Sequence, residues 1–372
     1  MAFSPKYTIT PKILKAISSI EVSRHEVSGL PITASMIVSL RESARLASTH
    51  HSTAIEGNRL SPPEVAEVIR GGGHFPNREK DELEVRNYYK ALELMETLAK
   101  ENRPLTERDI KALHGLSFGG RMKPTPYRDG QNVIRSGKLV VYIPPKAEDV
   151  PALMADLVKW VEQAVTEGLP IPFVAGLAHY QFATIHPYYD GNGRTARLLA
   201  TLILHKYGYD LKGIYSLEEY YARNLQAYYN ALDVGNDEDY YEGHRATADL
   251  TGFLDYFVEG MANSFDKVRQ SAENAQRSGD MDQSLLLRNL SPKQRQVIKL
   301  FLSSQRISTR EIAQFFQVSD RQARHLCKQW VQEGFLEVSN PAPKTRDFQL
   351  VEKYEVLVRE YLSKSKVSFP ES

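Results

Sequence analysis

The sequence predicts a mainly α-helical protein with one β-hairpin and a separate C-terminal unit of three short helices and two strands. Apolar residues recur at helical spacing through most of the chain, with capping signals between the helices. One alternating stretch with a central turn, residues 132–143, is typical of a β-hairpin. The helical pattern stops at residues 276–284, and a new series of short capped helices begins after them.

Composition and charge are those of an ordinary globular protein. The 372 residues suggest two or three domains, and 42% hydrophobic with 25% charged residues is the usual balance. A formal net charge of +1 gives no global field that would favour nucleic acid or membrane. The single cysteine, Cys327, excludes an internal disulfide and fits a reducing compartment. Since we find no signal peptide and no apolar run of membrane-spanning length, we expect a cytoplasmic protein.

Helix signals order most of the first 275 residues. The first thirty residues are polar and contain only one short amphipathic piece, residues 13–20. Residues 173–185 are apolar nearly all round, which is typical of a buried central helix. The other predicted helices span residues 32–55, 62–70, 81–100, 106–118, 147–167, 198–207, 217–233 and 246–273.

The helix predicted over residues 32–55 ends in an unusual way. Gly57-Asn58 is a plausible C-cap, so Glu56 is the last side chain before the helix stops. An acid is disfavoured there because the negative end of the helix dipole repels it. Ser52 lies one turn earlier on the same face. A surface acid at a frayed helix end would explain Glu56 without any function.

The predicted hairpin pairs residues 132–134 with residues 139–143 around Ser136-Gly137-Lys138, and Pro144-Pro145 closes it. An isolated hairpin is only marginally stable in water. We therefore expect the hairpin to lie over another element and to leave one strand edge free.

In the C-terminal unit, Ser291, Ser308 and Ser319 precede three short helices, and residues 335–338 and 348–351 suit two strands. This arrangement resembles a winged helix-turn-helix domain, with the two strands as its wing. Residues 285–353 hold 12 Lys and Arg against 6 Asp and Glu. The third helix would turn outward a basic, amide-rich face that suits phosphates and base edges: Arg321, Gln322, Arg324, His325, Lys328 and Gln329. A winged helix used for protein contact or dimerisation is the alternative.

The segment from His186 to Arg197, with the sequence His-Pro-Tyr-Tyr-Asp-Gly-Asn-Gly-Arg-Thr-Ala-Arg, concentrates the chemically capable residues. Its glycine spacing matches the dinucleotide-binding pattern, but that motif needs a preceding strand, and here the preceding run is helical. The chain contains no Walker sequence and no histidines and cysteines with zinc spacing.

The parts of this segment indicate what it can do. Residues 191–193 permit a tight turn that, with the start of the next helix, makes an anion nest. Asp190 is a hard oxygen ligand suited to Mg²⁺ bridging two phosphates. Arg194 and Arg197 lie one turn apart and can bind successive phosphates, and His186 can take a proton near neutral pH. Together they suit phosphoryl or nucleotidyl transfer to a hydroxyl; separate capping, turn and surface roles are the alternative.

The same segment resembles the signature of the Fic family, His-Pro-Phe-x-Asp-Gly-Asn-Gly-Arg-x-x-Arg, with Tyr188 in the place of the phenylalanine. The resemblance extends over roughly residues 32–265. It implies a Fic-type helical bundle in which the hairpin is a flap and the winged helix an appendage. It also implies transfer of AMP from ATP to a Ser, Thr or Tyr hydroxyl of a protein, with release of diphosphate.

The resemblance further implies roles for individual residues. His186 would be the general base, and Asp190 would hold Mg²⁺. The target protein would add a strand to the flap. The residues that would bind ATP lie in the anion hole and its helix, on the flap and at two more distant positions: Gly191, Asn192, Gly193, Arg194, Thr195, Ala196, Arg197, Leu139, Val140, Val141, Tyr142, Tyr228 and Asn236.

Ser52-x-x-x-Glu56-Gly57 also resembles the inhibitory motif of the family, here N-terminal to the core. In such members the glutamate pairs with the second arginine of the signature, Arg197 in this chain, so that the γ-phosphate cannot seat. The resemblance therefore implies an autoinhibited adenylyltransferase that modifies target proteins and itself. Removal of AMP by the same site and an ATP-sensing, DNA-binding regulator are the alternatives.

These inferences give a predicted domain organisation and a set of partners. We expect the target protein to bind along the flap and DNA or another protein to bind at the winged helix. A homodimer with a second copy of the chain is possible, and we expect no membrane partner. The predicted parts are an N-terminal region, residues 1–110, with an inhibitory helix at about 45–57; a catalytic core, residues 111–275, with flap 131–145 and active-site loop 186–197; a linker, residues 276–284; and a winged helix-turn-helix domain, residues 285–372.

Overall fold

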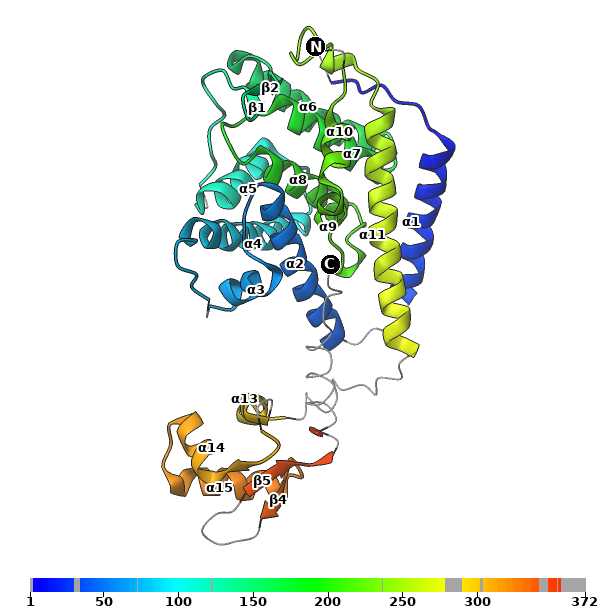
Figure 1. Ribbon diagram of the computed structural model, residues 1–372. Coiled ribbons are helices and arrows are strands. Elements are labelled where there is room, and N and C mark those ends of the chain that lie inside the picture. The colour runs from blue at the N-terminus through cyan, green and yellow to red at the C-terminus, as the bar shows by residue number, and fades with distance from the viewer. Residues whose placement is uncertain are drawn as a thin grey trace. The chain divides into compact units, whose positions relative to one another are not determined.

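The structure is a computed structural model that describes residues 3–29, 34–71, 73–121, 123–235, 237–277, 290–301, 304–340, 347–352 and 354–355. The chain divides into two compact units, Met1–Arg277 and Ser278–Ser372. Helices dominate and two small antiparallel sheets accompany them, which confirms the predicted mainly α class (Figure 1). Within the described ranges no helix combines the length and the apolar character that crossing a membrane requires.

Helix α7 (Ile171–Ile185) is the central helix of the larger unit. Nearly all of its side chains are buried, as its continuous apolar sequence predicts. It packs against α6, α8 and α11, and its C-terminal end leads into the segment that begins with His186. The helices of this unit besides α7 are α1 (Pro11–Gly29), α2 (Ala34–Ile55), α3 (Pro62–Arg70), α4 (Glu79–Ala99), α5 (Glu107–Gly119), α6 (Val150–Thr166), α8 (Asn192–Lys206), α9 (Glu218–Arg223), α10 (Leu225–Leu232) and α11 (Thr251–Arg277), with short 3₁₀ turns η1 (Ala147–Asp149), η2 (Leu211–Gly213) and η3 (Arg245–Thr247).

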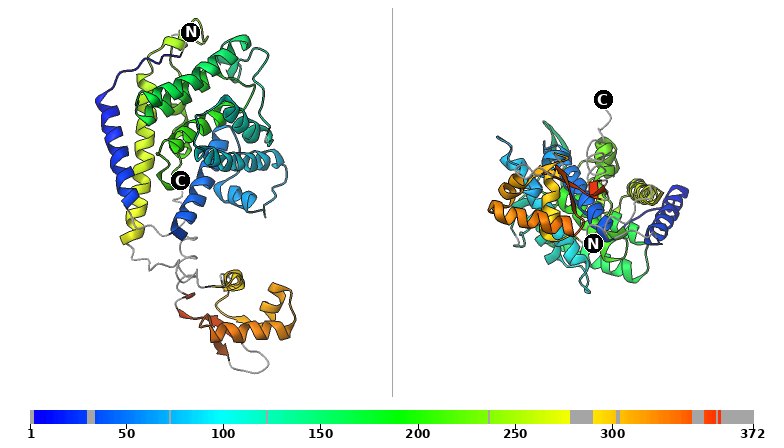
Figure 2. Two further views of the ribbon diagram at one scale, coloured as in Figure 1. Left: turned by 180° about the vertical axis from the view of Figure 1, so that it is seen from behind. Right: turned by 90° about the horizontal axis from the view of Figure 1, so that it is seen from below.

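The prediction for the first thirty residues was wrong in extent, because α1 is a full helix and not a short amphipathic piece. It lies alongside α11, as both Figure 1 and Figure 2 show. Its buried side includes a serine and an alanine, so the apolar contrast along the sequence is weak and the packing against α11 stabilises the helix. The buried side chains are Ile13, Ala16, Ile20, Ser23 and Val27.

Two predicted helix boundaries are also wrong. The helix expected over residues 217–233 is divided into α9 and α10 at Asn224, whose side-chain oxygen accepts a hydrogen bond from the N–H of Ala227 (3.0 Å). Asparagine competes with the helix backbone in this way and starts a new helix. Helix α8 begins at Asn192 and not at Leu198, because Gly191 takes a left-handed conformation (φ 77°) and caps it.

The predicted hairpin is present as β1 (Ile134–Ser136) and β2 (Leu139–Tyr142). The strands are antiparallel, with Ser136 opposite Leu139 across the turn. Beyond β2, the N–H of Ile143 donates to the carbonyl of Glu238 (2.9 Å), so the base of the hairpin is attached to the acidic segment before α11.

The smaller unit contains α13 (Pro292–Phe301), β3 (Ile307–Ser308), α14 (Thr309–Phe316), α15 (Asp320–Gln332), β4 (Leu336–Asn340) and β5 (Asp347–Leu350). Its sheet has the order β3-β5-β4, and Trp330 and Phe335 lie in its core. The predicted helices and wing strands are present, and the two-residue strand β3 is an addition. The assignment to the winged helix class stays a prediction. Most of the predicted linker, residues 278–284, lies outside the described residues.

Candidate active site

His186 lies at the point where α7 ends. It adopts a left-handed conformation (φ 51°), and its N–H donates to the carbonyl of Phe182 at 3.0 Å, which closes the helix. Its Nδ1 lies 3.2 Å from the carbonyl oxygen of Ala183, so the ring donates a proton there and leaves Nε2 free to accept one. Burial lowers the pKa of His186 to about 4, and the imidazole is therefore neutral at pH 7. A neutral imidazole with an available nitrogen can act as a general base.

The loop after His186 is held by buried side chains. The amide of Asn192 accepts a hydrogen bond from the N–H of Tyr188 (3.0 Å) and donates one to its carbonyl (2.8 Å). The ring of Tyr188 stacks on His114, with centroids 3.6 Å apart and an interplanar angle of 10°. His114 in turn lies 2.9 Å, through Nε2, from the carbonyl oxygen of Asp190. These contacts fix the backbone that leads to α8.

The start of α8 forms a cradle that only glycine permits. Gly191 has a positive φ and caps the helix, and a Cβ atom on Gly193 would lie 2.3 Å from Oε1 of Glu56. The N-terminus of a helix carries unpaired N–H groups and the positive end of the dipole, which together attract anions. In this structure the carboxylate of Glu56 is the anion that lies against the cradle.

Arg194 is a buried cation with unused donors. Its side chain is 3% exposed, and Nε and Nη1 have no hydrogen-bond partner among the described residues. The nearest carboxylates are those of Asp190 (3.8 Å) and Glu84 (4.0 Å). Buried donors without partners cost free energy. An anionic ligand in the cradle would satisfy them.

Arg197 is held by helix α2. Its Nε donates to Oγ of Ser52 (2.8 Å), and its Nη2 donates to the carbonyl of Ser52 (2.9 Å) and to Oε1 of Glu56 (2.8 Å). Burial is the largest influence on the pKa of Arg197 and lowers it, but the Glu56 carboxylate together with Tyr228 and Tyr88 raises the pKa above its ordinary value, so the guanidinium stays charged. The pairing of Glu56 with Arg197 that the sequence predicted is thus present in the geometry.

Asp190 is suited to share a metal ion with a ligand. Its side chain is 63% exposed. Among the described residues there is no group of three or more His, Cys, Asp and Glu side chains that could hold an ion. The exposed carboxylate of Asp190 fits Mg²⁺, because that ion takes its other oxygens from phosphates and water.

The hairpin presents apolar side chains beside the loop. Leu139 is 66% exposed and Val141 is 37% exposed, whereas Val140 is half-buried. The hydroxyl of Tyr142 donates to the carbonyl of Thr184 near the end of α7 (2.7 Å). This bond ties the hairpin to the helix that carries His186.

The side chains of Thr195 and Ala196 are fully buried in α8, so only their main-chain groups could contact a ligand. Asn236 lies outside the described residues.

Tyr228 is buried in an aromatic cluster. Its hydroxyl lies 3.0 Å from Nε2 of His179, and its ring stacks on Tyr221. Its contact with a nucleotide stays a prediction. The neighbouring Tyr229 is 45% exposed, and its hydroxyl lies 3.4 Å from the carbonyl oxygen of Ile55 at the end of α2. Tyr229 is thus the aromatic ring of α10 with an accessible face.

Sequence reasoning missed Arg128 and His114. Buried Arg128 donates from Nε to the carbonyl of His186 (3.0 Å), from Nη1 to that of Gly130 (3.0 Å) and from Nη2 to that of Pro145. It therefore joins the end of α7 to both ends of the hairpin segment. The sequence around Arg128 indicates only a turn, and His114 is a lone histidine on a predicted helix, so neither carries a local signal.

Comparison with known proteins agrees with this geometry. Residues 104–204 match the model of the Fic/DOC family. The chain is 30% identical over 221 residues to protein adenylyltransferase fic-1 of Caenorhabditis briggsae, which covers 58% of this chain and 42% of that protein. It is 28% identical over 277 residues to fic-1 of Caenorhabditis elegans, covering 72% and 50%. The chain thus spans about half the length of the curated relatives it matches.

Two solved structures have a similar fold. A Fic family protein from Desulfovibrio desulfuricans G20 superimposes with a TM-score of 0.63 at 24% identity, over 94% of this chain and 99% of that one. A Fic domain containing signaling protein from Bacteroides thetaiotaomicron VPI-5482 gives 0.59 at 25% identity, over 71% and 97%. The Fic-type fold that the signature implied is thereby confirmed, and the match of residues 104–204 confirms the resemblance to the Fic family itself.

Proposed function

Because residues 104–204 form a Fic/DOC-family domain, we propose that the chain is a protein adenylyltransferase, which transfers AMP from ATP to a hydroxyl group of a protein. The observation that carries this proposal is a single cradle bordered by a neutral imidazole, a buried arginine with unused donors and an exposed carboxylate: His186, Arg194 and Asp190. A polyphosphate satisfies the arginine and the helix N-terminus at once.

The reaction follows from these groups. The hydroxyl oxygen of the target attacks the α-phosphorus of ATP, the bond to the diphosphate breaks, and the hydroxyl proton passes to Nε2 of His186. The cradle and Arg194 stabilise the negative charge on the phosphates. Mg²⁺ held by Asp190 would neutralise further phosphate charge when bound. The exposed edge and apolar side chains of β2 would position the target segment as an added strand.

The same geometry supports autoinhibition. The carboxylate of Glu56 pairs with Arg197 at 2.8 Å and lies so close to Gly193 that a Cβ atom there would collide with it. A γ-phosphate that needs Arg197 meets this carboxylate, and two negative charges repel each other at such a distance. ATP would then bind in an unproductive position until α2 moves.

Intact-mass measurement of the full chain after incubation with ATP and Mg²⁺ tests the proposal. Glu56→Gly should gain the mass of one or more AMP groups at least about tenfold faster than wild type, because each 1.4 kcal/mol of relieved inhibition is tenfold in rate. His186→Ala in the Glu56→Gly background should abolish the gain. Glu101→Gly is the matched control, since Glu101 is another helix-end acid paired with an arginine, Arg103 at 2.6 Å.

If the His186→Ala variant still gained the mass of AMP, His186 would not be the general base. A Glu56→Gly protein that gains no AMP while wild type removes AMP from a modified protein would favour the reverse reaction.

The basic face of α15 favours DNA binding as a second function. Arg321, Arg324, His325 and Lys328 are exposed, and together with Lys293 of α13 they line one hollow of the smaller unit. None of these side chains forms an ion pair with an acidic side chain of the described residues. Cations left unpaired on one helix face are typical of a surface that contacts phosphates.

Fluorescence anisotropy with a labelled duplex tests this function. We expect binding at low salt that weakens steeply as salt rises, with a shallower salt dependence for Arg321→Ala and Arg324→Ala. Lys159→Ala, which removes an exposed cation of the larger unit, is the control. Failure of the full chain to bind any duplex at low salt would exclude DNA and leave protein contact for this face.

A further inference from the structure

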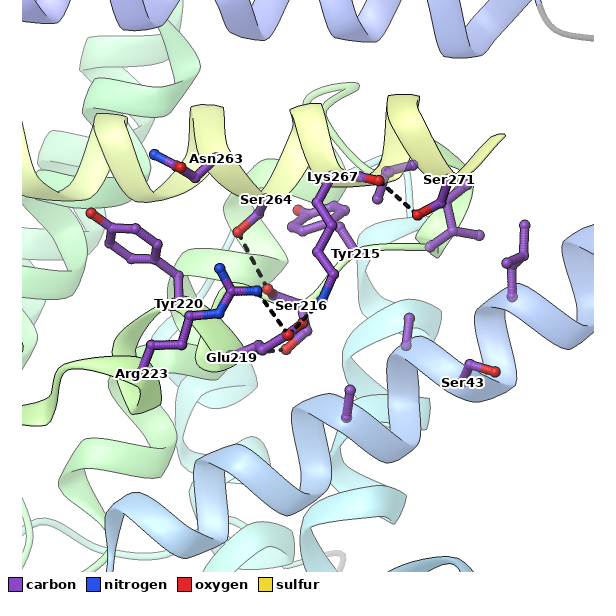
Figure 3. Close-up of a pocket in the computed structure, with 15 residues that line it drawn as sticks. Ser43, Tyr215, Ser216, Glu219, Tyr220, Arg223, Asn263, Ser264, Lys267 and Ser271 are labelled. Carbon is purple, nitrogen blue, oxygen red and sulfur yellow. Dashed lines mark hydrogen bonds and ion pairs between the residues drawn. The ribbon is translucent and has the colours of Figure 1, made fainter. Parts of the chain in front are cut away.

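A cavity of about 220 Å³ lies between α2, α9 and α11, away from the residues of the proposed active site (Figure 3). Helix α2 forms one wall with Leu40, Ser43, Ala44 and Ala47, which follow the spacing of a single helix face. Small side chains at three of these four positions keep this wall back from the neighbouring helices. The cavity has room for a ligand on the order of ten non-hydrogen atoms.

The rim of the cavity is cationic. Glu219 pairs with Arg223 (3.0 Å) and with Lys267, both of which line the cavity. Arg223 and Lys267 are 56% and 53% exposed, whereas Glu219 is 26% exposed. Two cations therefore share one carboxylate, and donors on both remain available to a second anion. Figure 3 shows the three charged side chains gathered on one side of the cavity.

The inner part of the cavity combines apolar surface with an unused hydrogen-bonding group. Ile214 and Val268 add to the apolar wall of α2. Tyr215 also lines the cavity; its side chain is only 8% exposed, and its hydroxyl has no hydrogen-bond partner among the described residues. A buried hydroxyl without a partner costs free energy that a bound polar group would recover.

We propose that this cavity binds a small organic anion, with a carboxylate or phosphate head at Arg223 and Lys267 and an apolar body against α2. The cationic rim selects the charged head, and the apolar wall selects the body. Neither feature belongs to the ATP site, so the ligand is distinct from the nucleotide.

A ligand in the cavity would stabilise the docked position of α2. The consequence for activity rests on the proposed function. Helix α2 supplies one wall, so the complete site exists only while α2 is docked. A ligand that binds one state of an equilibrium stabilises that state. The docked state is the one in which Ser52 and Glu56 hold Arg197, and Ser48, one residue beyond Ala47, donates to Glu218 (2.9 Å). The anion therefore strengthens inhibition.

Ligand-observed NMR titration of the full chain tests the site without reference to activity. Phenyl phosphate and phenylacetate are the probes, and benzyl alcohol is the neutral control. We expect both anions to bind and benzyl alcohol to bind at least about fivefold more weakly, because charge-assisted hydrogen bonds are lost. Lys267→Met should weaken the anions by a similar factor, and Ala47→Leu, which fills the cavity, should abolish binding.

Lys12→Met is the matched control, since Lys12 is 54% exposed and pairs with Glu259 of α11 outside the cavity. Binding of neither anion, or equal binding by Lys267→Met and wild type, would overturn the site.

Self-modification rates test the effect on α2. The anions should slow the residual reaction of wild type and leave Glu56→Gly unchanged, because that variant has no carboxylate to hold against Arg197. Equal slowing of both proteins would place the probes in the ATP site and refute the proposal. If Glu56→Gly shows no self-modification at all, the proposed function fails while the binding result for the cavity still stands.

Discussion

Arg194 and Tyr188 are two of the buried side chains with polar atoms that have no hydrogen-bond partner among the described residues, and the reasons differ. The free donors of Arg194 border the anion cradle, so a ligand can satisfy them. The hydroxyl of Tyr188 is packed among aromatic rings, including those of His114 and Tyr127, where no ligand can reach it. The unused donors of Arg194 thus indicate a place where an anion can bind, whereas the unpaired hydroxyl of Tyr188 only lowers the stability of the fold.

Tyr188→Phe should therefore raise the free energy of unfolding by roughly 1 kcal/mol, since it removes a buried hydroxyl without a partner. Tyr142→Phe is the matched control and should lower it by about 1 kcal/mol, because the Tyr142 hydroxyl donates to Thr184 at 2.7 Å. Urea denaturation followed by circular dichroism measures both. A loss of stability in Tyr188→Phe equal to that of the control would mean that its hydroxyl has a partner after all.

For individual residues, the sequence predicted those groupings whose members are close together along the chain. The residues from His186 to Arg197 are adjacent, so their grouping is visible in the sequence, and Glu56 stood out because an acid is unusual at a helix end. The roles of Arg128 and His114 depend on backbone carbonyls 58 and 76 residues away, which no spacing rule reveals.

At the scale of elements, α2 is fastened to the bundle by several polar contacts. The strongest in geometry is Arg45 with Glu96 of α4, where Nε and Nη2 donate to the two carboxylate oxygens at 2.7 and 2.6 Å. Tyr89 of α4 adds a hydrogen bond to Glu42 (2.7 Å). These contacts hold α2 in the position from which Ser52 and Glu56 reach Arg197.

Arg45→Met should loosen α2 and raise the basal self-modification rate of wild type by about fivefold, because loss of a partly buried bidentate pair costs about 1 kcal/mol. The rate of Glu56→Gly should not change, since inhibition is already absent there. Arg103→Met, which breaks another bidentate pair with Asp109 away from α2, is the control. A rise in the control as large as in Arg45→Met would mean that general destabilisation, and not α2, sets the rate.

Helices with a strong apolar periodicity or clear capping residues could be predicted from the sequence. Helices whose bounds depend on packing against other helices, or on a single residue, could not. α7 and the capped α3 and α5 follow directly from their sequences. α1 was missed in length because its buried side contains small and polar residues that become a packing face only beside α11. The division between α9 and α10 was missed because one asparagine decided it.

At the scale of the molecule, burial keeps five histidines of the larger unit neutral. Burial lowers the pKa of His179 to about 3 and that of His51, His114, His186 and His205 to about 4, from an ordinary value of 6.5. Below pH 6.5 the unfolded chain therefore binds protons that the folded unit excludes. The stability that these groups contribute is complete above pH 6.5 and is lost as the pH falls toward 4.

The free energy of unfolding of the larger unit should thus fall between pH 7.5 and pH 5.5, by about 1 kcal/mol for each fully buried imidazole such as His179. Urea titrations at the two values measure this. Few carboxylates titrate in that window, because their pKa values lie near or below 4.5. An unchanged urea midpoint would show that these histidines are protonated in the folded state.

Glu56 and Arg197 are 141 residues apart but belong to one polypeptide. In the inhibition that we propose, the carboxylate that would compete with a γ-phosphate is therefore tethered, and its local concentration is fixed by the fold and independent of how much protein the cell makes. Dilution cannot separate the pair, and added ATP would compete with a partner that cannot diffuse away. The resting activity of such a chain would then be the same at one copy per cell as at thousands.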